Sequence, residues 1–198
     1  MVRQLTYALV ADGGTDRVLQ PIIERSIRCI DPAVEILEPE FRKRRGPVAE
    51  YLSKYHHGAM LLFVHRDAEG TGPEARRVEF AHVNDERVVP LIPVRMTEAW
   101  LLGDADAIAR AAGRPGANIQ LPPSHSVENI ANPKSLLESL LIEAAGRPTG
   151  RKRKQFIKHL TSHRINVAAY LRDFSVLDGL SAYRQFLRDL QRAYPYAL

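Results

Sequence analysis

Carboxylate side chains follow three apolar segments of this sequence, each at the point where the segment gives way to a loop. In chain order they are Asp12, Asp16, Asp67, Glu69 and Glu98. Carboxylate oxygens are hard ligands that suit Mg²⁺ or Mn²⁺, and several of them on one rim repel each other unless a cation lies between them. These residue types therefore predict a divalent-metal site, provided that the fold brings the three loops together.

Four strands are predicted to position these loops, over residues 5–11, 34–41, 59–65 and 87–94. Helices are predicted between them, and a short one ends at His56. Alternating strands and helices favour right-handed β-α-β units and a mostly parallel sheet. In such a sheet the loops after the first, third and fourth strands open at the same carboxyl-end edge. Pro90 and Pro93 cannot donate ladder hydrogen bonds, so we expect the fourth strand at the edge of the sheet or interrupted by a bulge.

Beyond Gly103 the pattern is helical, with predicted helices over residues 104–112, 133–145, 151–163 and 180–193. We interpret Trp100, just before this region, as a core residue and not as a base-stacking platform. The economical reading is one domain over residues 1–198, in which an α/β core (1–103) carries a packed helical extension (104–198). The fold class is therefore α/β, with a mostly parallel sheet flanked by helices.

Positive charge is concentrated in one part of the chain. Lys and Arg number 28 and Asp and Glu number 23, but residues 144–172 hold eight basic side chains and no acid, which leaves 20 basic against 23 acidic elsewhere. A basic region on a slightly acidic body is typical of a site for a polyanion such as nucleic acid, although a solvated helix face has the same pattern.

Length and cysteine content restrict the class of protein. The chain of 198 residues is long enough for one core, and its longest apolar stretch is far shorter than the roughly 20 residues of a membrane helix. We read residues 5–11 as a strand and not as a signal peptide. The lone Cys29 allows no internal disulfide, which favours a reducing cytoplasm, and we expect this thiol to be buried as a small hydrophobic group.

Two motifs resemble the Toprim fold, which topoisomerases, bacterial primases and the overcoming-lysogenization-defect nucleases share. They are the turn Asp12-Gly13-Gly14-Thr15-Asp16 after the first strand and the acidic pair of Asp67 and Glu69 after a hydrophobic strand. The segments TEAWLLGD (97–104) and Asn132-Pro133-Lys134 resemble a small stand-alone branch of Toprim-like proteins that are often encoded next to an ATPase. Toprim domains usually have Glu in place of Asp12 and Asp in place of Glu69. Both differences keep a carboxylate and change its reach by one methylene.

The resemblance implies metal-dependent hydrolysis of phosphodiester bonds. Asp67 and Glu69 would hold the metal, Asp12 would be a ligand or the acid/base group, and Asp16 and Glu98 would complete a second metal site. Lys134 would neutralise a phosphate. Basic side chains would bind the nucleic-acid backbone, and the candidates are Arg42, Arg44, Arg147, Arg151, Lys152, Arg153, Lys154 and Lys158.

We therefore expect a cytoplasmic, Mg²⁺- or Mn²⁺-dependent nuclease or nuclease subunit, without a membrane anchor, that forms an oligomer or works with an ATPase in defence against foreign DNA. Two other classes stay open. The first is a nucleic-acid- or partner-binding regulatory subunit with weak catalysis, which the departures at Asp12 and Glu69 favour. The second is a small phosphotransfer enzyme, because a fold alone does not fix a function.

Overall fold

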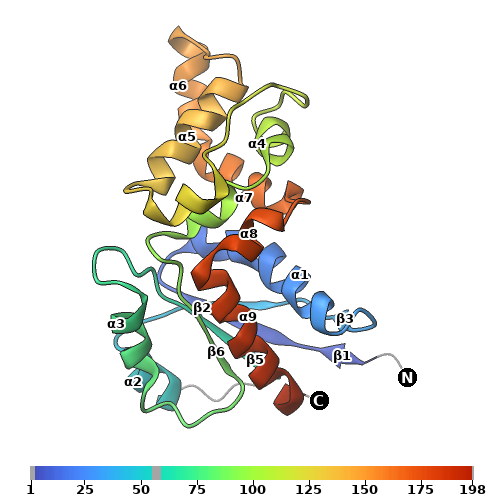
Figure 1. Cartoon of the computed structure of the whole chain (residues 1–198), viewed down its shortest axis with the longest axis vertical. Coiled ribbons are helices and arrows are strands. Elements are labelled where there is room, and N and C mark those ends of the chain that lie inside the picture. Colours follow the sequence, from blue (N-terminus) through green and yellow to red (C-terminus); the bar gives the residue numbers. More distant parts are fainter. Residues whose placement is uncertain (1–2, 55–58, 198) are drawn as a thin grey trace. The chain divides into compact units, whose positions relative to one another are not determined.

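The computed structural model describes residues 3–54 and 59–197 and divides the chain into two compact units (Figure 1). We call Met1–Val94 with Ser181–Leu198 the sheet unit, and Arg95–Leu180 the helical unit. The sequence placed the limit of the α/β region at Gly103 and the last helix in the extension. In the structure the last helix belongs to the sheet unit.

All strand pairs in the sheet unit are parallel, which confirms the predicted type of sheet. The main sheet has the order β4-β2-β5-β6, and its strands are β2 (Tyr7–Ala11), β4 (Glu40–Lys43), β5 (Leu61–His65) and β6 (Val88–Leu91). A smaller pair joins β1 (Gln4–Leu5) to β3 (Glu35–Ile36). The strand predicted over 34–41 is thus two short strands, and β6, which contains Pro90, lies at the edge as expected.

Helices cover both faces of the main sheet because successive side chains of its buried strands point to opposite faces (Figure 1). One face packs against α2 (Val48–Lys54) and η2 (Val78–Phe80) through Ala8, Val10, Leu62 and Val64. On the other face Tyr7 meets Phe63 edge to face, and Phe63 contacts Phe186 of α9 (Ser181–Ala193). The same unit holds η1 (Gly14–Leu19), α1 (Gln20–Ile30), α3 (Pro73–Arg77) and η5 (Tyr194–Ala197).

Two details of the sheet unit differ from prediction. Cys29 is exposed and not buried, because the buried side of α1 consists of Ile22, Ile23, Ser26 and Ile27. The predicted end of the α2 helix at His56 lies outside the described residues.

Helices and 3₁₀ turns build the helical unit, as the sequence predicts. Its elements are η3 (Thr97–Leu101), α4 (Ala105–Ala111), η4 (Ser124–Asn129), α5 (Pro133–Ala144), α6 (Gly150–Lys158), α7 (Leu160–Tyr170) and α8 (Ser175–Gly179). The helix predicted over 151–163 breaks at His159, which separates α6 from α7. Trp100 is 1% exposed, which confirms its place in a core. Among the described helices, none is both long and apolar enough to cross a bilayer.

Candidate functional site

The carboxyl ends of β2 and β5 lie side by side, and charged residues follow both strands. Val10 is opposite Val64 in the parallel register, so Asp12 and the run from His65 to Asp67 leave the sheet at the same edge. This edge is where open α/β sheets usually place their ligands. The structure thus confirms that the loops after the first and third predicted strands of the sequence meet.

Asp12 is held there by two arginines from the neighbouring strands. Arg44, just after β4, donates from Nη2 to Oδ1 of Asp12, and Arg66, just after β5, donates from Nη1 to Oδ2 at 2.7 Å. Each carboxylate oxygen therefore has its own guanidinium partner. Both arginine side chains are mostly buried, whereas the Asp12 side chain is 46% exposed.

Arg66 extends this arrangement into a larger network of charges. Its Nε and Nη2 donate to the two carboxylate oxygens of Glu79 in η2, at 2.7 and 3.1 Å, and Nη1 of Arg76 donates to the same carboxylate at 2.9 Å. Burial opposes ionisation of Glu79, but the hydrogen bonds from Arg66 and Arg76 outweigh it and lower its pKa. The pKa of Arg66 is raised, chiefly by the hydrogen bond to Glu79 and then by Asp12. These groups are therefore charged at neutral pH.

His65 forms a second, buried group of charges between two of the predicted acids. Its Nε2 lies 3.0 Å from Oδ1 of Asp67, and its Nδ1 lies 3.4 Å from Oδ2 of Asp16. Burial alone would lower the pKa of His65, but the hydrogen bonds to Asp16 and Asp67 raise it to about 9. Burial likewise opposes ionisation of Asp16, whose pKa is nevertheless lowered by His65 and by the backbone N–H of Gly13. At neutral pH one imidazolium thus lies between the two carboxylates and offsets part of their negative charge.

The other two predicted acids lie elsewhere. Glu69 is exposed on a turn, where its φ of 48° falls in the left-handed region. Glu98 belongs to η3 of the helical unit, where its Oε1 accepts a hydrogen bond from Nη1 of Arg164 at 2.7 Å. Arg164 is itself buried, so this member of the basic segment serves an internal ion pair and is not part of a surface for a polyanion.

The carboxylates provide oxygen donors of the type that the divalent cation implied by the sequence requires. The oxygens of Asp12, Asp16 and Asp67, however, are directed at Arg44, Arg66 and His65. Within residues 3–54 and 59–197, no three His, Cys, Asp or Glu side chains are grouped so that they could hold a metal ion. In this arrangement the residues do not fit a metal site, and the protein's own cations neutralise the acids.

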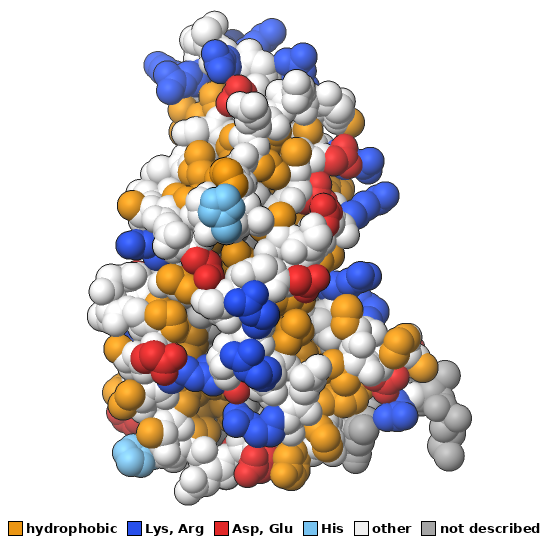
Figure 2. Space-filling view, in the orientation of Figure 1, with side chains coloured by type: hydrophobic (Ala, Val, Ile, Leu, Met, Phe, Trp, Pro, Cys, Tyr) orange, Lys and Arg blue, Asp and Glu red, His pale blue; other side chains and the backbone are white. Residues whose placement is uncertain are grey.

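Exposed cations gather on α6, in the helical unit. Arg151, Lys152, Arg153, Lys154 and Lys158 are all exposed, and no residue of α6 is fully buried. In the described part of the chain none of these five side chains forms an ion pair. Figure 2 shows Lys and Arg side chains crowded over this helix. The predicted basic residues therefore form a surface with uncompensated positive charge.

The remaining predicted cations do not belong to α6. Lys134 is exposed at the start of α5, and Arg147, also exposed, forms an ion pair of 3.2 Å with Glu143. Arg42 in β4 forms an ion pair with Glu40. Arg44 is the cation described above beside Asp12, and it lies in the sheet unit.

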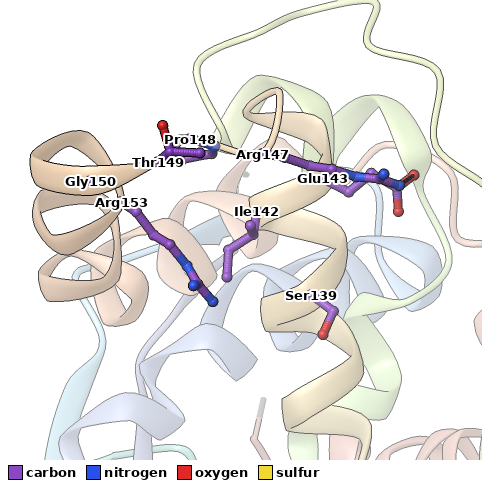
Figure 3. Close-up of a pocket in the computed structure, with 8 residues that line it drawn as sticks. All are labelled: Ser139, Ile142, Glu143, Arg147, Pro148, Thr149, Gly150 and Arg153. Carbon is purple, nitrogen blue, oxygen red and sulfur yellow. Dashed lines mark hydrogen bonds and ion pairs between the residues drawn. The ribbon is translucent and has the colours of Figure 1, made fainter.

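A groove of about 540 Å³ lies between α5 and α6 (Figure 3). Arg153 extends from α6 across this groove toward the Ile142 side of α5, while Arg147 and Glu143 lie together at the opposite rim. Ser139 and Thr149 add hydroxyl groups to the lining. The groove thus offers a cation and small polar groups beside the basic surface of α6.

Sequence reasoning from the acids alone missed His65, Arg66 and Glu79. The first two directly precede Asp67, so their position beside the site could have been read from the sequence. Glu79 gives no such signal, because only the folded chain brings η2 to Arg66.

Comparison of the chain with protein-family models, with curated proteins and with solved structures found no match.

Proposed function

We propose that this protein binds nucleic acid through the α6 surface. The observation that carries the proposal is the row of five exposed basic side chains on α6, from Arg151 to Lys158, with no acidic partner in the described structure. A solvated helix face normally mixes both signs of charge. Residues 144–172, in contrast, contain eight basic side chains and no acidic one.

The chemistry of this surface favours contact with phosphates over reading of bases. Lys and Arg neutralise backbone phosphates and release counterions, which makes binding independent of sequence and strongly dependent on salt. Arg153 at the α5–α6 groove would place one guanidinium against a phosphate while its neighbours follow the strand. The resemblance to stand-alone Toprim-like proteins extends the proposal to a cytoplasmic defence complex in which an ATPase is the partner.

A charge-matched pair of triple variants tests the proposal. Replacing Arg151, Lys152 and Lys154 by Gln should weaken binding to DNA and RNA and reduce the slope of log K against log salt by about 2 to 3 for duplex DNA. The control replaces Arg184, Arg188 and Arg192 of α9 by Gln, which removes the same charge from exposed positions of the sheet unit. Equal losses in both variants would show that only net charge matters and would contradict a site on α6.

A second candidate function, a metal-dependent phosphodiesterase, is favoured by one observation. Asp12, Asp16 and Asp67 converge on the carboxyl edge of two adjacent central strands, although each now faces a protein cation. If this function holds, Asp67→Asn should abolish Mg²⁺- or Mn²⁺-dependent cleavage of plasmid, linear and single-stranded substrates. Asp106→Asn, which alters an exposed acid paired with Arg110, should leave cleavage unchanged. Salt-sensitive binding without cleavage would favour the binding subunit.

A further inference from the structure

A second cavity, of about 500 Å³, opens in the sheet unit beside the Asp12 network. Its lining includes Arg44, Arg66 and Glu79, together with the turn and first residues of α2 over 46–49. The two arginines that line this cavity are the same two that hold Asp12. A pocket of this size with two convergent guanidinium groups is suited to a small anionic ligand.

The two arginines differ in how many of their N–H donors are already hydrogen-bonded within the protein. Arg66 gives Nε and Nη2 to Glu79 and only Nη1 to Asp12. Arg44 gives Nη2 to Asp12 and Nη1 to the carbonyl of Gly46, while its buried Nε has no partner among the described residues. An unsatisfied buried donor is rare and calls for an explanation. Departure of Asp12 would free one edge of Arg44 and one nitrogen of Arg66.

We propose that this pocket binds a phosphate monoester, which displaces the carboxylate of Asp12 from the two arginines that line the pocket. The carboxylate of Asp12 bridges the two guanidinium groups as two oxygens of a phosphate would. Because its side chain is 46% exposed, it can turn into solvent without opening the core. The phosphate would accept hydrogen bonds from Nε and Nη2 of Arg44 and from Nη1 of Arg66. It would thereby supply an acceptor for Nε of Arg44, which Asp12 does not contact.

The charge of the ligand decides between a monoester and a diester. A monoester carries about −1.5 to −2 near neutral pH and has three free oxygens, whereas a diester carries a single charge, as Asp12 does. A diester therefore gains nothing in charge over a carboxylate that is already tethered at the site. A terminal phosphate, on a nucleotide or at the 5′ end of a strand, has the advantage that displacement requires.

Calorimetric titration of the whole chain with a nucleoside 5′-monophosphate and with its methyl ester tests the proposal. The monoester should bind at least about tenfold more tightly than the methyl ester, because it carries the greater charge. Oligonucleotides with a 5′-phosphate and with a 5′-hydroxyl then distinguish a strand end from a free nucleotide as the source of the phosphate. Inorganic phosphate serves as the competitor.

Three variants make the result specific to the pocket. Asp12→Asn should raise the affinity for the monoester about fivefold, since a competing ion pair is lost. Asp12→Ala also removes the carboxylate and should have the same effect. Arg44→Lys keeps the charge but removes the bidentate edge, and should lower the affinity about tenfold. Asp106→Asn and Arg110→Lys alter a comparable exposed ion pair in the helical unit and should change nothing.

Equal binding of the monoester and its methyl ester would overturn the proposal. So would the absence of binding to both the wild type and Asp12→Asn up to about 10 mM, where even a weak site fills. The α6 variants above leave this pocket intact, because it belongs to the sheet unit. Failure of nucleic-acid binding on α6 and failure of phosphate binding here are therefore separate results.

Discussion

The Nε2 atom of His65 lies 3.0 Å from Oδ1 of Asp67, two residues further along the chain. The other ring nitrogen faces Asp16 at 3.4 Å, so one buried imidazolium lies between two carboxylates from different segments. The positive charge that such acids need is thus supplied by a proton on His65. The sequence assigned this task to a metal ion.

We expect His65 to titrate at a higher pH than an ordinary histidine. Its pKa is raised to about 9 from an ordinary value of 6.5, because the hydrogen bonds that the protonated ring donates to Asp16 and Asp67 outweigh the effect of burial. The stabilisation from its proton is therefore fully present below pH 6.5 and is lost as the pH rises through about 9. NMR of the imidazole carbon-bound protons should show this titration, and urea unfolding should show the falling stability. A titration near 6.5 would contradict the bridging role.

Replacing His65 by Asn should destabilise the fold by about 3 kcal/mol, since it leaves two partly buried carboxylates without their cation. The variant should also lose the alkaline fall in stability. His82→Asn, a change at an exposed histidine of the same unit, is the control and should leave the free energy of unfolding nearly unchanged.

Acid should weaken the network around Glu79. Its pKa is lowered because the hydrogen bonds from Arg66 and Arg76 outweigh burial, so its stabilisation is present above pH 4.5 and is lost as the pH falls through the lowered pKa. We expect Glu79→Gln to cost about 2 kcal/mol at neutral pH, the typical value of hydrogen bonds to a charged group. The variant should lose less stability than the wild type between neutral pH and pH 3. A parallel pair of pH profiles would contradict the assigned role.

The ion pair of Glu98 and Arg164 is predicted to be structural. Glu98→Gln removes the nearer partner of Arg164, which is 6% exposed and keeps only Glu138 at 3.9 Å, and should cost about 2 kcal/mol in urea unfolding. A second change, Arg164→Met, should recover part of that loss, because the buried, poorly paired charge is then removed. If Glu98→Gln leaves stability unchanged, the carboxylate is free for another role, such as the metal ligand that the sequence suggested.

Trp100 offers a direct optical check on the position of nucleic acid. It is the one Trp of the chain and is 1% exposed, so its fluorescence should be that of a buried indole and should respond little to bound DNA. Trp100→Ala should cost about 4 kcal/mol by leaving a cavity. Strong quenching by single-stranded DNA at low salt would instead indicate stacking of a base on this ring.

Several features of this protein could be predicted from local patterns. Apolar runs predicted the strands near Leu5, Ala59 and Arg87, and the prolines of the last run predicted that β6 lies at an edge. The alternation of strands and helices predicted the parallel sheet, because a helix between two strands of one sheet carries the chain back so that both strands run in the same direction. The basic segment that contains α6 is likewise visible in the sequence as a run of like charge.

The partners of the acids could not be predicted in the same way. Arg44 and Arg66 reach Asp12 across strands that are far apart in the chain, and Glu98 turns to Arg164 within the helical unit. The return of α9 to the sheet depends on contacts such as that of Phe186 with Phe63. Hydrophobic periodicity is a local property, so the sequence by itself determined which segments become strands and helices and which residues carry charge. Charge pairing depends on distance in space, so only the tertiary structure decided that the acids at the sheet edge are neutralised by His65 and two arginines.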